Sequence, residues 1–174
     1  AKDLAGLADI YVLDGFAVAH RDAPSVTGLA KFLPTYAGLL MEAEVVGLNK
    51  VTNKPKKPMV VVLGGAKMET KIPVINSLLK NANNILVGGG IVNTYLWSQG
   101  HKIGDSLIDK EYKKEAIKYC RNKKVILPVD VVVGTPDGKA ARVISLNKKL
   151  NLKKGEAIFD VGPETVNLFA KYIK

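Results

Sequence analysis

The sequence has little of what disulfide or metal chemistry requires. Cys120 is the only cysteine, and only two histidines occur among the 174 residues. Neither an internal disulfide nor a multi-cysteine metal site can therefore form. The opening residues lack the basic start and apolar run of a secretory signal, and no apolar run is long enough to cross a membrane. We expect a soluble protein of a reducing compartment, the cytoplasm, with no metal ligands of its own and no membrane partner.

Aromatic side chains are also scarce, at 6% of the residues. The chain carries 26 basic and 16 acidic side chains and a formal charge of +10, which favours anionic partners such as nucleotides, phosphorylated metabolites or nucleic acid. The lysines lie in short runs without interleaved aromatic residues, so the stacking side chains of a single-strand binder are lacking. This pattern is more typical of solvated loops and helix ends, and we expect small anionic substrates and no nucleic acid.

Common phosphate-binding fingerprints are absent. Neither G-x-x-x-x-G-K-[ST] nor G-x-G-x-x-G occurs at a glycine-bearing turn, which disfavours a P-loop enzyme or a dehydrogenase. Paired carboxylates, a Ser-His-Asp set and a histidine cluster are not evident either. Any phosphate site must therefore be built in another way.

The most regular feature is a repeated unit in which an apolar strand-like run ends in glycine and leads into a helix-like segment. Near-continuous apolar strands that alternate with helices indicate a parallel sheet covered on both faces. We therefore predict an α/β fold with a parallel, doubly wound, Rossmann-like sheet. The three units run through residues 59–79, 85–99 and 157–173, and two further strands are expected at 124–127 and 130–133.

The opening section has a different pattern. Residues 9–12 read as a strand that leads into a loop, and 34–49 read as a helix. The polar, proline-bearing segment 51–58 is typical of a linker. We therefore assign residues 1–50 to the tail end of one α/β domain and 51–174 to a second, incomplete one.

The glycine-bearing turns are the best candidates for a ligand site. Ligands of open parallel sheets bind beyond the carboxyl ends of the strands, so we expect the three turns to share one edge. Helix N-termini there would offer N–H groups and positive dipole ends to phosphate. Lys67 and Lys71, expected in the first turn of a helix, would oppose the dipole unless an anion lies nearby. Ordinary surface lysines and tight turns without a ligand remain alternatives.

The loop after the first strand contains another candidate. An arginine such as Arg21 can hold a carboxylate or phosphate through its planar fork. An exposed arginine beside an incidental His20 fits the spacing as well. Asp14 can be a site carboxylate or a turn former.

Several motifs follow one another along essentially the whole chain. They are DIYVLDGFAVAHR, PTYAGLLMEAEV, LGGAK with a lysine four residues later, VGGGIVNTYL, IGDSL, LPVDVVV and DVGPET. Taken in this order, they resemble phosphoglycerate kinase. Upstream of the glycine turns, the resemblance includes the loop that ends in Ala-His-Arg and the interdomain helix of that family.

This resemblance implies a monomeric, two-domain glycolytic kinase that moves the acyl phosphate of 1,3-bisphosphoglycerate reversibly onto MgADP. It implies catalytic roles for Lys71 and Arg21, with Mg²⁺ held through the nucleotide and by a ligand outside these residues. The chain corresponds to the central portion of that family, so we expect it to be inactive alone; a non-catalytic ADP- or ATP-binding module is the alternative. The implied contacts are Gly65, Ala66, Lys67 and Lys71 for the nucleotide, Gly89, Gly90 and Leu107 for the adenine, and His20 and Arg21 for the phosphoglycerate.

Overall fold

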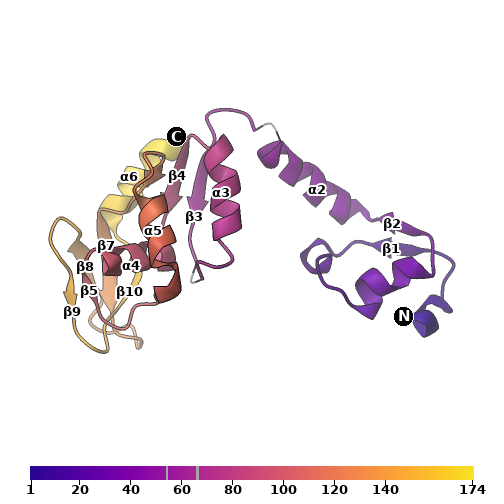
Figure 1. Ribbon diagram of the computed structural model, residues 1–174, viewed down its shortest axis with the longest axis horizontal. Helices are drawn as coiled ribbons and strands as arrows, with labels where there is room; N and C mark the ends of the chain where they lie inside the picture. Colours follow the sequence, from indigo (N-terminus) through magenta and orange to yellow (C-terminus); the bar gives the residue numbers. More distant parts are fainter. Residues whose placement is uncertain (54, 66) are drawn as a thin grey trace. The chain divides into compact units, whose positions relative to one another are not determined.

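The computed structural model describes residues 1–53, 55–65 and 67–174. It divides the chain into two compact units, Ala1–Lys56 and Lys57–Lys174, whose elements are labelled in Figure 1. The division falls inside the segment that the sequence predicts as a linker. Each unit is described by itself below.

The first unit contains a two-stranded parallel sheet. Strand β1 (Tyr11–Leu13) pairs with β2 (Thr35–Ala37), with Tyr11 opposite Thr35. The prediction of a helix from residue 34 onward is therefore wrong at its start, because β1 offers residues 35–37 a strand partner. Helix α2 begins only afterwards, at Leu39, and runs to Thr52. The shorter helical turns are α1 (Lys2–Ala5), η1 (Phe16–Val18), η2 (Pro24–Gly28) and η3 (Leu29–Lys31).

Asp14 supplies the cap of α2. The N-cap residue is Gly38, which has no side chain, and the Met41 N–H donates to Asp14 Oδ1 at 2.9 Å. A Cβ at Gly38 would collide with the Asp14 carboxylate. Asp14, directly after β1, thus serves as a helix cap for α2, a role that differs from the site carboxylate and the turn former considered above.

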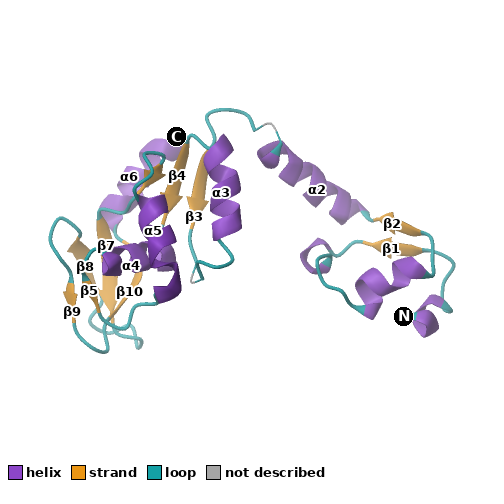
Figure 2. Cartoon of the chain, in the orientation of Figure 1, coloured by secondary structure: helices purple, strands orange, loops and turns teal. Residues whose placement is uncertain are grey.

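The second unit is built on a parallel sheet with strand order β3-β4-β6. The register is regular, with Val60 opposite Asn84 and Ile85 opposite Val125. Figure 2 shows α3 and α5 in front of these strands and α6, drawn fainter, farther back. The predicted succession of strand, glycine turn and helix is confirmed for the first two units. The strands are β3 (Val60–Leu63), β4 (Asn84–Val87) and β6 (Val125–Ile126), and the helices are α3 (Ile72–Asn81), α4 (Gly89–Ser98), α5 (Lys113–Cys120) and α6 (Pro163–Ile173).

The third predicted unit does not join this parallel sheet. Its strand β10 (Ala157–Val161) runs antiparallel to β7 (Asp130–Gly134) in a separate sheet of order β10-β7-β8. On its other edge β7 pairs antiparallel with β8 (Arg142–Ser145), a largely exposed strand that the sequence pattern did not predict. Because β7 pairs with β8 on one side and β10 on the other, the fold class stays α/β but contains both sheet types. The remaining short elements are β5 (Lys102–Ile103), η4 (Lys110–Tyr112) and β9 (Asn151–Leu152).

Two apolar clusters hold the second unit together. One fills the space between the sheets and includes Ile85, Val131 and Val133, all at most 1% exposed. The other joins α3, α4 and α5 and contains Met68, which is fully buried. Burial of side chains of this size stabilises a fold by about 1.5–3 kcal/mol each, so Met68 anchors the loop between β3 and α3 to the helices. Within the described ranges, no helix is long and apolar enough to span a membrane.

Asp130 caps α6 in the same way that Asp14 caps α2. Its carboxylate, 1% exposed, accepts hydrogen bonds from the Glu164 N–H, the Thr165 N–H and the Thr165 hydroxyl. Burial alone would raise the pKa of Asp130, but these hydrogen bonds together outweigh it and hold the pKa below its ordinary value. A side chain on the N-cap residue Gly162 would collide with this carboxylate, so glycine is required there.

Candidate functional site

The first two glycine turns meet backbone to backbone. The Gly90 N–H donates to the Gly65 carbonyl at 2.9 Å. A Cβ at Gly89 would lie 2.9 Å from both the nitrogen and the oxygen of Gly65. Gly65 and Gly89 also have positive φ angles of 113° and 61°, which favour glycine. The close approach of the two turns therefore accounts for Gly89, whereas Gly64 faces open space, since a Cβ there would have no atom within 4 Å.

Lys71 folds back over this contact. A Cβ at Gly65 would lie 3.1 Å from Lys71 Cε and 3.6 Å from its Nζ, so the ammonium group stays close to the Gly65 backbone. Lys71 is the N-cap residue of α3, where a cation opposes the helix dipole. In the described part of the chain, its ammonium group forms no ion pair with a carboxylate. Lys71 is thus a half-buried cation without a protein counterion, next to the two glycine turns.

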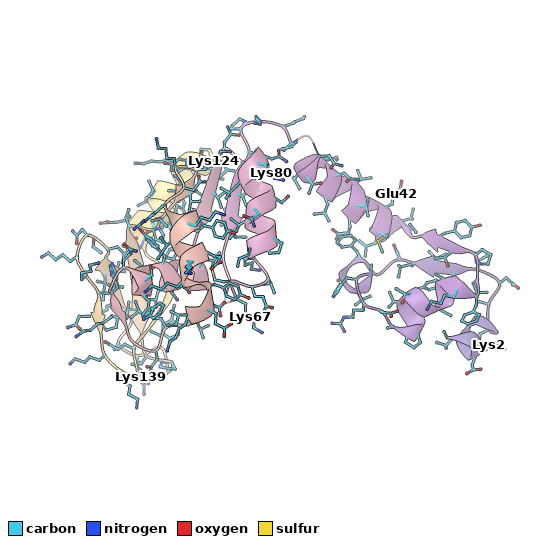
Figure 3. All side chains as sticks on the ribbon, viewed as in Figure 1. Lys2, Glu42, Lys67, Lys80, Lys124 and Lys139 are labelled. Carbon is cyan, nitrogen blue, oxygen red and sulfur yellow. The ribbon has the colours of Figure 1, made fainter. Side chains whose placement is uncertain are left out.

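Lys67 lies on the same loop, but not in the helix. The helix begins at Ile72, so the prediction that Lys67 belongs to its first turn is wrong. The turn before α3 is closed instead by hydrogen bonds from the Lys71 and Ile72 N–H groups to the Met68 carbonyl. Lys67 is exposed at the end of the sheet where β3 terminates, and Lys80 lies at the opposite end of α3 (Figure 3). Ala66, the remaining predicted residue of this loop, lies outside the described residues.

Leu107 projects from a loop that is fixed on both sides. Its neighbour Ser106 is buried and accepts a hydrogen bond from the Ile158 N–H at 2.8 Å. Two residues later, the Asp109 N–H donates to Thr94 Oγ1 at 3.0 Å. Leu107 itself is 65% exposed. An exposed leucine on a fixed loop offers a flat apolar ligand a contact surface without a cost of loop ordering.

Thr94 and Asp109 connect this loop to the glycine turns, and sequence reasoning missed both. The Thr94 hydroxyl donates to the Gly90 carbonyl at 2.7 Å, and the Asp109 carboxylate accepts from the Met68 N–H at 2.5 Å. A threonine inside a helix and an aspartate before one have ordinary local explanations. Nothing in the sequence pattern therefore distinguishes them.

The third turn lies beside the second, although its strand belongs to the other sheet. A Cβ at Gly88 would be 3.7 Å from Val161 Cγ1. A crevice between α4 and the end of β10 is lined by Gly88, Gly89 and Asp160, among others, and has a volume of about 20 Å³. This volume suits a single water molecule, so a larger ligand must lie on the open side of the turns.

Acidic side chains lie near the loop between β3 and α3, which contains Met68. Burial, followed by Glu69, Glu111 and Asp109, raises the pKa of the Tyr112 phenol above its ordinary value. Acidic groups therefore lie near the loop, and its attraction for anions depends on Lys67 and Lys71. Within the described residues, no three histidine, cysteine, aspartate or glutamate side chains gather as metal ligands. The donor set of these described residues does not fit a metal ion held by their side chains alone.

His20 and Arg21 belong to the first unit. Both are exposed, and the Arg21 N–H donates to the Val18 carbonyl at 2.9 Å. The backbone of Arg21 is thereby fixed at the end of η1, and its guanidinium group is open to solvent. The structure thus brings Gly65, Lys71, Gly89 and Gly90 together in the second unit, while His20 and Arg21 form a separate pair in the first.

Comparison with known proteins gives a consistent result. The sequence model described as phosphoglycerate kinase matches residues 1–174. The chain is 39% identical to the phosphoglycerate kinase of Baumannia cicadellinicola over 175 residues and 41% identical to that of Herpetosiphon aurantiacus over 180 residues. It spans 44% and 45% of these curated relatives, while 100% and 99% of the chain is covered.

Two solved structures have a similar fold. One is phosphoglycerate kinase from Coxiella burnetii, with a TM-score of 0.78 and 38% identity. The other is phosphoglycerate kinase from Pyrococcus horikoshii, with a TM-score of 0.83 and 29% identity. Each comparison covers 99% of the chain, but only 46% and 45% of the respective structures.

Proposed function

Because the chain belongs to the phosphoglycerate kinase family, we propose that its protein transfers a phosphoryl group between 1,3-bisphosphoglycerate and MgADP, giving 3-phosphoglycerate and MgATP. The relatives that it matches are more than twice its length, with 44% and 45% of each covered. We assign turnover to the whole protein, and expect these 174 residues to be insufficient alone. A glycolytic role and the single cysteine support a cytoplasmic location.

The two units have different proposed roles. The second unit binds the nucleotide, with its phosphates at Lys67, Lys71 and the Gly65 loop, and its adenine against Gly89, Gly90 and Leu107. The first unit belongs to the phosphoglycerate-binding domain, where His20 and Arg21 face the acidic substrate.

One observation carries this proposal: the Lys71 ammonium group, which forms no ion pair with a carboxylate of the described residues, lies over Gly65, where the two glycine turns meet. Phosphoryl transfer requires little covalent chemistry from the protein, since positioning and compensation of charge on the phosphoryl oxygens account for most of the catalysis. A fixed cation that already opposes a helix dipole gains a favourable partner when an anionic phosphate binds. Lys71 is thus suited to stabilise the charge on the transferred group.

Replacement of Lys71 tests this role. In the whole enzyme, Lys71→Ala should lower kcat by about two orders of magnitude or more, as loss of one preorganised charge stabiliser does. Its thermal stability should stay equal or rise slightly, because removal of a cation from a helix N-terminus relieves about 0.3–1 kcal/mol of repulsion. Lys80→Ala is the matched control, since Lys80 is an exposed lysine in the last turn of the same helix. Near-normal turnover of Lys71→Ala would contradict the assignment.

The alternative function is a non-catalytic module that retains an ADP- or ATP-binding surface. Titration calorimetry with ADP and a coupled kinase assay on the same whole protein distinguish the two. The proposal predicts binding together with turnover, whereas binding without turnover would favour the module.

A further inference from the structure

We propose that Asp109 is a positioning residue of the nucleotide site, which holds the loop that carries Lys67 and Lys71 against the N-terminus of α4. This inference rests on the proposed function of that loop. Its basis is a series of hydrogen bonds that connects Met68 with Gly65 by way of Asp109, Thr94 and Gly90. The links run from Met68 to Asp109 (2.5 Å), from Asp109 to Thr94 (3.0 Å), from Thr94 to Gly90 (2.7 Å) and from Gly90 to Gly65 (2.9 Å).

The Asp109 side chain does not serve the helix that follows it. An aspartate at the N-cap normally accepts a hydrogen bond from the second or third residue of its own helix. Asp109 is the N-cap residue of η4, yet its carboxylate makes no such bond and accepts instead from Met68, 41 residues away in the sequence. The Asp109 carboxylate therefore stabilises a tertiary contact, at the loop that contains Lys67 and Lys71.

Met68 is a suitable point at which to fix this loop. Its side chain is fully buried among α3, α4 and α5, and its carbonyl accepts the N–H groups of Lys71 and Ile72. A displacement of the Met68 backbone would therefore move the Lys71 N-cap as well. Since the Lys71 side chain lies over Gly65, the Asp109 bond indirectly sets the position of the ammonium group.

Thr94 connects Asp109 with the glycine turn before α4. It is fully buried, and its hydroxyl both donates to the Gly90 carbonyl and accepts from the Asp109 N–H. A buried polar group with all its bonds made fixes its neighbours, whereas one that loses a partner is costly. Two parts of the proposed site, the Lys71 loop and the glycine turn before α4, are thus fixed relative to each other by Asp109 and Thr94.

The role of Asp109 depends on its acceptor oxygen and not on its charge, because a negative charge near the lysines would repel a phosphate. Two variants separate these contributions. Asp109→Asn keeps an acceptor and the side-chain volume, while Asp109→Leu removes both acceptors at similar volume. Asp137→Leu is the matched control, since Asp137 also accepts a backbone N–H, that of Lys139, in an exposed turn.

The experiment measures the KM for MgADP, kcat and the hydrogen exchange rate of the Met68 amide in the whole enzyme. Asp109→Leu should raise the KM for MgADP and the exchange rate each by up to about tenfold, the factor expected for loss of one intramolecular hydrogen bond. For Asp109→Asn and Asp137→Leu, the KM for MgADP and the exchange rate should both stay within about twofold of the wild-type values. A merely structural role would lower the melting temperature and leave the KM of the folded enzyme unchanged, and that result overturns the proposal.

Thr94→Val and Thr94→Ser provide the test if Asp109→Leu does not fold. Valine removes the hydroxyl at nearly constant volume and should raise the KM for MgADP, while serine should keep it near the wild-type value. A wild-type KM in Thr94→Val refutes the positioning role. If the wild-type enzyme shows no kinase turnover, the proposed function fails, but exchange of the Met68 amide still tests whether Asp109 holds the loop.

Discussion

Alanine substitutions at Gly89 and Gly64 test whether each glycine of the site is required for the stability of the fold. Gly89 has a φ of 61°, and a Cβ there would lie 2.9 Å from the nitrogen and oxygen of Gly65. A left-handed conformation costs a non-glycine residue about 1–2 kcal/mol, and forced overpacking adds about 1–3 kcal/mol. Gly89→Ala should therefore lower the free energy of unfolding by about 2–5 kcal/mol, a large part of the stability of an ordinary domain.

Gly64→Ala is the comparison. No atom lies within 4 Å of a Cβ at Gly64, and its φ is not in the left-handed region. Alanine there should leave the free energy of unfolding unchanged or raise it by up to about 1 kcal/mol through the unfolded state. If the nucleotide approaches the Gly64 backbone, the added methyl group should raise the KM for MgADP without a loss of stability.

Urea unfolding followed by circular dichroism gives both values. With a slope of about 2 kcal/mol/M, the midpoint for Gly89→Ala should fall by about 1–2.5 M, and that for Gly64→Ala should move by no more than about 0.5 M. Equal midpoints for the two variants would show that the contact between Gly89 and Gly65 does not explain the glycine, and the reasoning would then be refuted.

Two further predictions concern titratable groups away from the site. Asp130→Ala should lower the free energy of unfolding by about 2 kcal/mol, because the Glu164 and Thr165 N–H groups lose their acceptor. The folded-state pKa of Asp130 is lowered, so its stabilisation is complete above the pKa of the unfolded chain and is lost as pH falls through the folded value. The urea midpoints of the wild type and of Asp130→Asn should therefore differ at neutral pH and approach each other at acidic pH. A difference between the two midpoints that does not change with pH would contradict this. Burial raises the pKa of Cys120 to about 12, so a thiol reagent at pH 8 should modify it far more slowly in the folded protein than in urea. The stability due to the neutral thiol is complete below its reference pKa of 9.0 and is lost as pH rises toward about 12; equal reaction rates in the folded and unfolded protein would rule out this burial.

Local sequence was sufficient for the repeated strand and helix units. The apolar run at residues 59–63 became β3, and the glycine-rich turn at 88–90 opens α4. Gly100 has a φ of 85° just beyond α4, the left-handed conformation in which glycine commonly ends a helix. These features depend on residues within a few positions of one another, whose side-chain period and backbone preferences can be read directly.

The pairing of the strands could not be predicted from local sequence patterns. The apolar pattern of residues 157–161 is compatible with either strand direction, and only the folded chain shows that β10 pairs antiparallel with β7. Residues 35–37 likewise continue a helical pattern, but β1 recruits them into a sheet. The direction and partner of a strand depend on contacts between distant segments, which a local period does not report.

The same distinction between local and long-range information applies to the candidate site. The residue types, two lysines four apart and two glycine turns after apolar strands, were present in the sequence and predicted an anion site. The placement of Lys71 over Gly65, and the bond between Asp109 and Met68 across 41 residues, exist only in the folded chain. Sequence thus determined which groups were available, and tertiary structure decided which of them meet, because hydrogen bonds between distant segments form only after those segments have packed together.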